Sequence, residues 1–333
     1  MQSSQPAIVK QDVDLAPWTT LRMGGPSDYF AAAGSIEDLD HCLSWASQCG
    51  LPVFLLGSGS NVLFGEGGFR GLVLRNEFRG RERCGNEVEV AGGEDLGELI
   101  RYLNRQGLAG MERMYGIPGT VAGAVVGNAG AYGQEIGDRM VQAEIWEEGN
   151  ARPIPASQLE LRYRHSRFKT RRDWFLLSCR LRLAKSATDL QAASDQILQQ
   201  RLEKYPRELR CPGSFFKNLL ASELPEAQLK RIPEHFVRYG KIPAGMLLDA
   251  VGGKGQRCGG ARVADYHANL FINDGRASAC DLIELSSRLA ERVQERFGVT
   301  LEPEIRIVGD SFPPKSPPIS PAESFPAGAS GTK

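Results

Sequence analysis

Two stretches of small residues constrain the fold of this chain more than any other feature. The first, Gly57-Ser58-Gly59-Ser60-Asn61, follows an apolar run, residues 52–56, that predicts a buried strand. Glycine lets the backbone approach a ligand closely, and successive N–H groups can surround an anion such as a pyrophosphate. The dinucleotide fingerprint Gly-x-Gly-x-x-Gly is incomplete here, so a plain tight turn stays open as the alternative.

The second stretch covers residues 116–124 and 127–133, and we interpret it as another ligand-binding loop. So many small residues permit close packing against a flat ring and a phosphate, although a Gly/Ala-packed crossing of two elements explains them too. The candidate cofactor-binding residues of the two stretches are Gly57, Ser58, Gly59, Ser60, Asn61, Gly116, Pro118, Gly119, Thr120, Gly123 and Ala124.

Charge and cysteine usage narrow the class of protein. Lys+Arg and Asp+Glu number 40 each in 333 residues, which argues against a nucleic-acid or membrane-surface role. The seven cysteines form no Cys-x-x-Cys pair and the four histidines no metal-ligand pattern, so we expect a reduced cytoplasmic protein without a metal. No run is long and apolar enough to span a bilayer, and the first residues lack the features of a signal peptide.

The periodicity predicts an α+β protein. Ser35 and Asp38 begin a helix that ends at Gly50; strands follow at residues 72–74 and 88–91, and a helix carries Leu96 to Leu103. Residues 141–183 are mostly strand, with a hairpin turn at Gly149-Asn150; residues 189–203 form a polar helix, and a last helix ends at Gly298. We divide the chain into an N-terminal extension (1–14), two cofactor-binding subdomains (15–76 and 77–188), a C-terminal substrate-binding domain (189–310) and a disordered Pro/Ser-rich tail (311–333).

Three polar segments carry residues suited to acid–base chemistry. They are Tyr163–Lys169, Gly213–Leu219 and Leu301–Arg306. Ser214 offers a hydroxyl between a Pro-Gly turn and two aromatic residues, and Arg164 offers a guanidinium that suits a carboxylate. Taken alone, Ser214 is equally consistent with a serine that satisfies a backbone group in a buried loop, and an arginine in such a position is more often part of a surface ion pair.

Together, in this order, the motifs resemble the UDP-N-acetylenolpyruvoylglucosamine reductases, flavoenzymes of bacterial cell-wall synthesis, from about Leu15 to Gly309. The resemblance implies a two-subdomain FAD-binding unit of the vanillyl-alcohol-oxidase (PCMH) type, with non-covalent FAD and NADPH as co-substrate. It further implies reduction of UDP-N-acetylglucosamine enolpyruvate to UDP-N-acetylmuramate, with hydride from flavin N5. Arg164 would bind the substrate carboxylate, Glu304 would stabilise its enolic form and Ser214 would donate the proton.

The resemblance also implies substrate contacts, with less detail about each. They are Tyr132, Lys204, Asn218, Lys254, His267 and Arg306. Only about 50 residues separate Arg164 from Ser214, so the chain resembles the shorter subclass without an inserted Tyr-bearing lid. We expect a cytoplasmic monomer. The alternatives are another FAD-dependent sugar or alcohol oxidase of the superfamily, or a flavin-binding module without catalysis.

Overall fold

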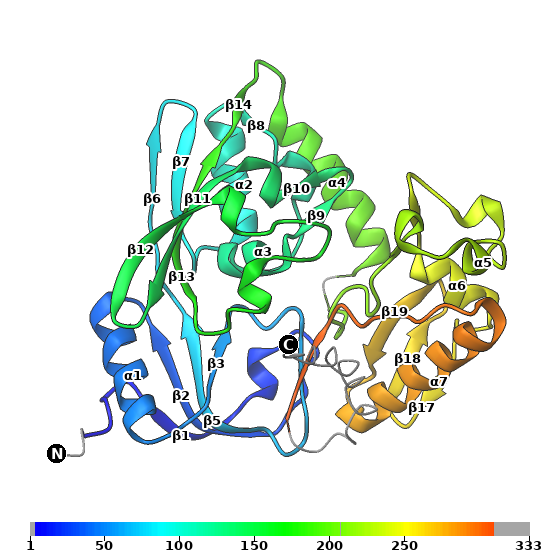
Figure 1. The fold of residues 1–333 in the computed structure, drawn as a ribbon, viewed down its shortest axis with the longest axis horizontal. Helices are drawn as coiled ribbons and strands as arrows, with labels where there is room; N and C mark the ends of the chain where they lie inside the picture. The colour runs from blue at the N-terminus through cyan, green and yellow to red at the C-terminus, as the bar shows by residue number, and fades with distance from the viewer. Residues whose placement is uncertain (1–3, 207, 310–333) are drawn as a thin grey trace, which may run out of the picture.

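The computed structural model describes residues 4–206 and 208–309. Within them, two sheets with their helices lie one above the other, and a third group of elements lies beside both (Figure 1). The predicted α+β class is therefore confirmed. The tail predicted at 311–333 lies outside the described residues, and the domain boundaries stay a prediction.

The first sheet holds the strand that leads into the first glycine-rich loop. Its order is β1 (Lys10–Asp14), β2 (Pro26–Ala33), β5 (Phe69–Asn76) and β3 (Val53–Leu56), antiparallel between β1 and β2 and parallel elsewhere. One helix, α1 (Ile36–Gln48), packs against it. The Ser35 hydroxyl accepts a hydrogen bond from the backbone N–H of Asp38, 3.1 Å away, which confirms the predicted helix start.

The second sheet runs in the order β12 (Asn150–Pro155), β11 (Met140–Glu147), β13 (Phe175–Arg182), β7 (Glu87–Ala91) and β6 (Arg81–Cys84). The predicted hairpin is present, but its two turn residues are Glu148 and Gly149, one position earlier than expected. Both have positive φ (50° and 79°), as tight two-residue hairpins require. Trp146 and Phe175 share a core with Leu72 and Leu74 of the first sheet, so the two sheets form one packed unit.

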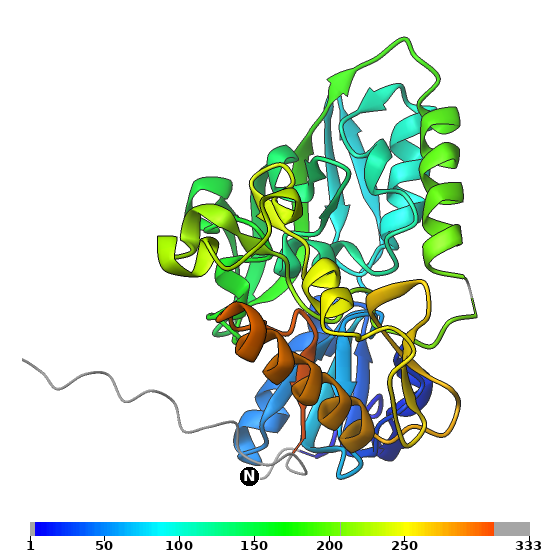
Figure 2. The same ribbon diagram turned by 90° about the vertical axis from the view of Figure 1, so that its right-hand side faces the viewer.

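Two helices lie along the second sheet. Asp95 caps the first of them, α2 (Leu96–Arg105). The predicted polar helix is α4 (Leu190–Lys204), which runs along the edge of the same unit toward the third group of elements (Figure 2). The helices are joined by a buried hydrogen bond of 2.8 Å from Asn104 Nδ2 to Ser194 Oγ. This contact fixes the direction in which the chain leaves the second sheet.

The second small-residue stretch is not a loop throughout. Residues Val121–Gly127 form a short helix, α3, whose first N–H groups are capped by the Thr120 hydroxyl, 3.2 Å from the N–H of Gly123. Asn128 ends the helix in the left-handed region, at φ 40°. The prediction of a continuous loop was wrong here because a run of Val and Ala after a Thr cap favours a helical turn.

The third group is an antiparallel sheet of β17 (Arg257–Cys258), β18 (Ala261–Ala264) and β19 (His267–Asn273). Helices α6 (Ala244–Ala250) and α7 (Ala279–Phe297) cover it, and α7 ends at Gly298 as predicted. The chain then returns to the first unit, where β20 (Arg306–Val308) pairs in parallel with β4 (Val62–Phe64), directly after the first glycine-rich loop. This last strand, orange in Figure 1, ties the C-terminal elements to that loop.

The remaining short elements connect these units. They are η1 (Ala16–Trp18), β8 (Leu108–Ala109), η2 (Glu112–Met114), β9 (Gly130–Ala131), β10 (Gln134–Glu135), η3 (Ile136–Arg139), η4 (Ala156–Gln158), η5 (Arg167–Lys169), β14 (Ala184–Lys185), β15 (Leu219–Leu220), η6 (Ala221–Glu223), α5 (Glu226–Leu229), η7 (Glu234–Phe236) and β16 (Lys241–Ile242).

Candidate functional site

A cavity of about 830 Å³ lies where the first sheet, the second sheet and the C-terminal elements meet. All eleven candidate cofactor-binding residues line it, as do Arg164, Ser214 and Glu304. Asn218 and Arg306 line it as well. The fold therefore brings the two small-residue stretches and the three polar segments to one site, of a size typical for small-molecule binding.

The backbone geometry of the cavity wall fits a flavin nucleotide. A Cβ placed on Gly119 or Gly123 would have no neighbour closer than 3.4 Å, and one on Gly127 would have none within 4 Å, so the missing side chains leave backbone open to the cavity. Open backbone of this kind suits a flat ring and a pyrophosphate. No histidine is among the described residues that line the cavity.

The two small-residue stretches also contact each other. A Cβ on Gly57 would lie 2.7 Å from the Thr120 hydroxyl, and one on Gly59 would lie 1.9 Å from the carbonyl oxygen of Trp18. Gly59 has φ +68° and its carbonyl accepts the N–H of Thr20, 3.1 Å away. These two glycines are therefore required for packing, whatever else the loop binds.

The Ser214 and Glu304 segments are joined by backbone pairing. The N–H of Lys217 donates to the carbonyl of Glu302 (2.9 Å), and the N–H of Glu304 donates to the carbonyl of Phe215 (2.8 Å). Buried Asn269 on β19 supports the same segment, because its side chain accepts from the N–H of Phe216 (2.9 Å) and donates to its carbonyl (2.8 Å). Sequence reasoning missed Asn269, whose only local signal is a polar residue in an apolar strand.

Arg164 and Glu304 form an ion pair inside the cavity. Nε of Arg164 lies 2.7 Å from Oε1 of Glu304, and both side chains are about one-fifth exposed (20% and 21%). The guanidinium also donates to the carbonyls of Gly130 (2.9 Å) and Asn128 (3.4 Å), which fixes its plane. Arg164 has φ +52°, a strained conformation that the surrounding contacts impose. A guanidinium held this way is ready to bind a substrate carboxylate.

Ser214 lies on the opposite segment, and its hydroxyl contacts a side chain that the sequence analysis did not single out. Its Oγ is 3.3 Å from the hydroxyl oxygen of Tyr205, which also lines the cavity. The cation closest to Ser214 in the sequence, Lys217, pairs with the exposed carboxylate of Glu302. The strand of this segment begins only at Arg306. Without a strand before that residue, the side chains of Glu302, Glu304 and Arg306 are not aligned on one face, and each has a different partner.

Cations predominate around the cavity. Burial, followed by the positive charge of Lys217, lowers the pKa of Lys169, whose ammonium donates to the carbonyl of Arg164 (2.7 Å). Burial, followed by the charge of Arg172, lowers the pKa of Arg306 to about 10. Arg306 lies over the ring of Phe54, 4.2 Å from its centroid, so it faces the strand before the first loop. These charges favour an anionic ligand.

Four predicted substrate contacts do not line the cavity: Tyr132, Lys204, Lys254 and His267. Tyr132 is 46% exposed. The other three lie near one another, since burial and then the charges of Lys204 and Lys254 lower the pKa of His267 to about 4. Lys254 also pairs with Asp249 at 2.7 Å. This group begins at Lys204, the residue before Tyr205, and therefore adjoins the cavity.

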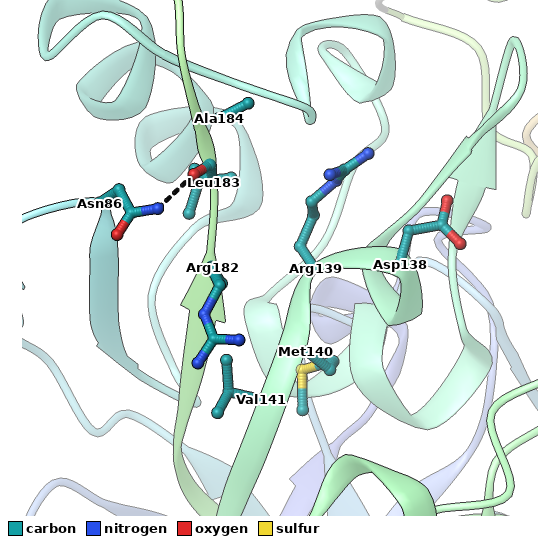
Figure 3. Close-up of a pocket in the computed structure, with 8 residues that line it drawn as sticks. All are labelled: Asn86, Asp138, Arg139, Met140, Val141, Arg182, Leu183 and Ala184. Carbon is teal, nitrogen blue, oxygen red and sulfur yellow. Dashed lines mark hydrogen bonds between the residues drawn. The ribbon is translucent and has the colours of Figure 1, made fainter.

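A second pocket, of about 500 Å³, lies at the side of the second sheet and contains none of the predicted residues (Figure 3). Its lining includes Asn86, whose amide donates to the carbonyl of Leu183 (3.0 Å), and Arg182, which pairs with Glu87. The pocket contains none of the residues of the three polar segments, so we do not assign it the chemistry, although Nε of Arg139 in its lining is buried without a hydrogen bond among the described residues. Among residues 4–206 and 208–309, no group of His, Cys, Asp or Glu is arranged to hold a metal, and no helix could cross a membrane.

Comparison with known proteins matches both parts of the chain. The family model of an FAD binding domain matches residues 27–150, and that of the UDP-N-acetylenolpyruvoylglucosamine reductase C-terminal domain matches residues 205–308. A protein named UDP-N-acetylenolpyruvoylglucosamine reductase from Solibacter usitatus is 39% identical over 302 residues, covering 90% of this chain and 97% of the relative. A protein of the same name from Moorella thermoacetica is 37% identical, covering 90% and 92%.

A solved structure is similar over the same length. The crystal structure of UDP-N-acetylenolpyruvylglucosamine reductase from Thermus caldophilus superposes with a TM-score of 0.72 at 28% identity, covering 89% of this chain and 98% of that one. The relatives thus span the flavin-binding unit, the cavity and the C-terminal elements together.

Proposed function

The chain belongs to the UDP-N-acetylenolpyruvoylglucosamine reductase family, and from that premise we propose roles for the residues around its central cavity. The protein is an FAD-dependent oxidoreductase, a UDP-N-acetylmuramate dehydrogenase of peptidoglycan precursor synthesis that acts on a UDP-sugar. An oxidase or a binding module without catalysis is not favoured, because relatives matching nine-tenths of the chain carry the reductase name.

The observation that carries the residue roles is the convergence of Arg164, Ser214 and Glu304 on one cavity that the two glycine-rich stretches also line. The residues of those stretches would hold FAD, which when bound would supply the hydride-transfer chemistry between NADPH and the enolpyruvyl double bond. The chain's own groups must then hold the charge that develops on the substrate carboxylate and deliver a proton to the neighbouring carbon.

Arg164 and Glu304 stabilise the developing charge. The Arg164 guanidinium, held by Glu304 and two backbone carbonyls, binds the substrate carboxylate. Glu304 holds the guanidinium in place and forms a hydrogen bond with the enolic carboxyl. Because these two side chains are only about one-fifth exposed, such interactions are stronger than in bulk water.

Ser214 donates the proton that completes the reduction. It sits on the segment paired with that of Glu304, so its hydroxyl and the carboxylate-binding pair face the same reacting group. Asn218 contributes a polar wall next to Ser214. Lys204 and Lys254 form an adjoining basic group suited to the substrate diphosphate, and His267, uncharged at neutral pH because its pKa is lowered to about 4, lies beside them. Tyr132 is an exposed substrate contact on the side of Arg201, and Arg306 lies on the flavin side.

The experiment that tests this proposal follows the colour of the bound flavin in a solution from which oxygen has been removed. The purified yellow protein should bleach with NADPH, regain its colour with UDP-N-acetylglucosamine enolpyruvate, and yield UDP-N-acetylmuramate. Failure to bleach, or recolouring only by oxygen, contradicts the proposal. We further propose a cytoplasmic monomer without nucleic-acid or membrane partners, which the balance of 40 basic and 40 acidic residues supports; light scattering of the purified protein tests the monomer.

A further inference from the structure

Tyr205 contacts Ser214, and the reaction proposed above gives this contact no role. The two hydroxyl oxygens are 3.3 Å apart, either can donate, and both residues line the central cavity. Tyr205 follows the last residue of α4. A serine hydroxyl is a weak acid, and after giving up its proton it needs a group that stabilises or reprotonates its oxygen.

Two cations lie over the ring of Tyr205. The guanidinium carbon of Arg201 lies 5.5 Å from the centroid of the Tyr205 ring, and Nζ of Lys204 lies 5.1 Å from it. Nε of Arg201 is buried and makes no hydrogen bond within the described part of the chain. Cations at these distances attract the face of the ring and so help to hold the phenol against Ser214.

Other neighbouring groups are already engaged. Lys217 pairs with Glu302, and the Lys169 ammonium donates to the carbonyl of Arg164. Neither contact involves the Ser214 hydroxyl. Among the described residues, Tyr205 is therefore the side chain whose hydrogen bond to the Ser214 hydroxyl allows the two groups to exchange a proton.

We propose that Tyr205 is a positioning residue that orients the Ser214 hydroxyl and replaces its proton during reduction of the substrate. The inference rests on the proposed role of Ser214 and names the partner that role requires. A phenol is a stronger acid than an aliphatic alcohol, so the proton moves toward the serine oxygen as negative charge forms there.

The Ser214 O–H bond breaks as its proton forms a C–H bond with the electron pair of the substrate's enolic carbon. The Tyr205 O–H proton passes to Ser214 Oγ, leaving a phenolate beside Arg201 and Lys204. Water returns a proton to the phenolate. The substrate gains one hydride, already supplied by the established reaction, and one proton.

The first test is Tyr205→Phe, which removes one oxygen and keeps the ring between its cations. Rates are measured per bound flavin, so a change in flavin content does not affect the comparison. We expect reduction by NADPH to stay within about twofold of wild type, while reoxidation by substrate slows about 10- to 100-fold, with little change in KM. Unchanged reoxidation overturns the inference.

Tyr266→Phe is the matched control. Its hydroxyl donates to the backbone carbonyl of Lys204 (3.1 Å) and so holds the same segment without contacting Ser214. Equal slowing in the two phenylalanine variants would mean that a loosened segment, rather than a lost proton path, explains the effect, and would overturn the inference.

The second test repeats Tyr205→Phe in a Ser214→Cys background. A thiol is acidic enough to donate without a relay, so the Tyr205 substitution should cost less than about threefold there. The same large loss in both backgrounds contradicts the relay while leaving Ser214 as the donor. Equal activity of Ser214→Ala and Ser214→Cys contradicts the role of Ser214 itself, so the two failures are distinguishable.

Discussion

Nε of Arg164 lies 2.7 Å from Oε1 of Glu304, although the two residues come from the second sheet unit and from the segment before the last strand. The pair bridges the flavin-binding unit and the C-terminal elements across the cavity. NADPH has no carboxylate corresponding to the enolpyruvyl group, so this pair should matter to one half-reaction only.

Replacing Arg164 or Glu304 by Ala should therefore slow reoxidation of the flavin by substrate by about 10³-fold, and reduction by NADPH by less than about threefold. Stopped-flow absorbance without oxygen measures both rates. Arg70→Ala, which breaks an exposed pair with Asp28, is the control and should change neither rate. Equal slowing of both half-reactions by the Arg164 or Glu304 variants would refute the assignment.

Gly123→Ala should affect folding and flavin binding in opposite directions. A Cβ there has only Thr120 Oγ1 nearby, at 3.5 Å, so the helix α3 should gain about 0.5–1 kcal/mol without flavin. The same methyl group points into the space we assign to the flavin, so FAD should dissociate at least about tenfold more readily.

Denaturant unfolding of flavin-free protein and fluorescence titration with FAD measure these two effects. Gly34→Ala, at an exposed site whose nearest atom is 3.8 Å away, serves as control and should leave FAD affinity unchanged. Normal FAD affinity in Gly123→Ala would remove α3 from the flavin site. Gly59 is a poorer probe, because a Cβ there meets the Trp18 carbonyl at 1.9 Å and disturbs the fold itself.

His267 should make the protein less stable in acid. Burial and the charges of Lys204 and Lys254 lower its pKa to about 4, with Asp249 opposing them, whereas an unfolded histidine titrates near its usual value of 6.5. Between these values the unfolded chain binds more protons, so stability is full above about pH 6.5 and is lost as the pH falls toward 4.

His267→Gln should consequently lose less unfolding free energy than wild type between about pH 7.5 and about pH 5. Urea unfolding at both pH values provides the measurement. His41→Gln, on the exposed surface of α1, should keep the acid sensitivity of wild type. An identical acid loss in wild type and His267→Gln would show that the imidazole does not cause it.

The parts of the fold that were predictable are those set by interactions between residues close together in the sequence. The Ser35–Asp38 cap and the buried strand before Gly57 follow from short-range patterns, and the structure has both. The Glu148–Gly149 turn was misplaced by one residue, because a hairpin register depends on the partner strand as well as on the turn.

The sequence predicts which residues form the site, but not how they come together in space. Motif order selected Arg164, Ser214 and Glu304, yet their meeting depends on pairing between Phe216 and Pro303, which no local pattern encodes. The hydrogen bond from Tyr205 and the support from Asn269 depend on how distant segments pack. Long-range packing of this kind is not visible in sequence periodicity.

The most direct measurement compares Ser214→Ala and Ser214→Cys in the two half-reactions. Both variants should bind FAD and be reduced by NADPH like wild type. Product formation should fall by about 10⁴-fold in the alanine variant and much less in the cysteine variant, since a thiol still carries a proton. Equal activities of the two variants, or equal damage to both half-reactions, would contradict Ser214 as the proton donor.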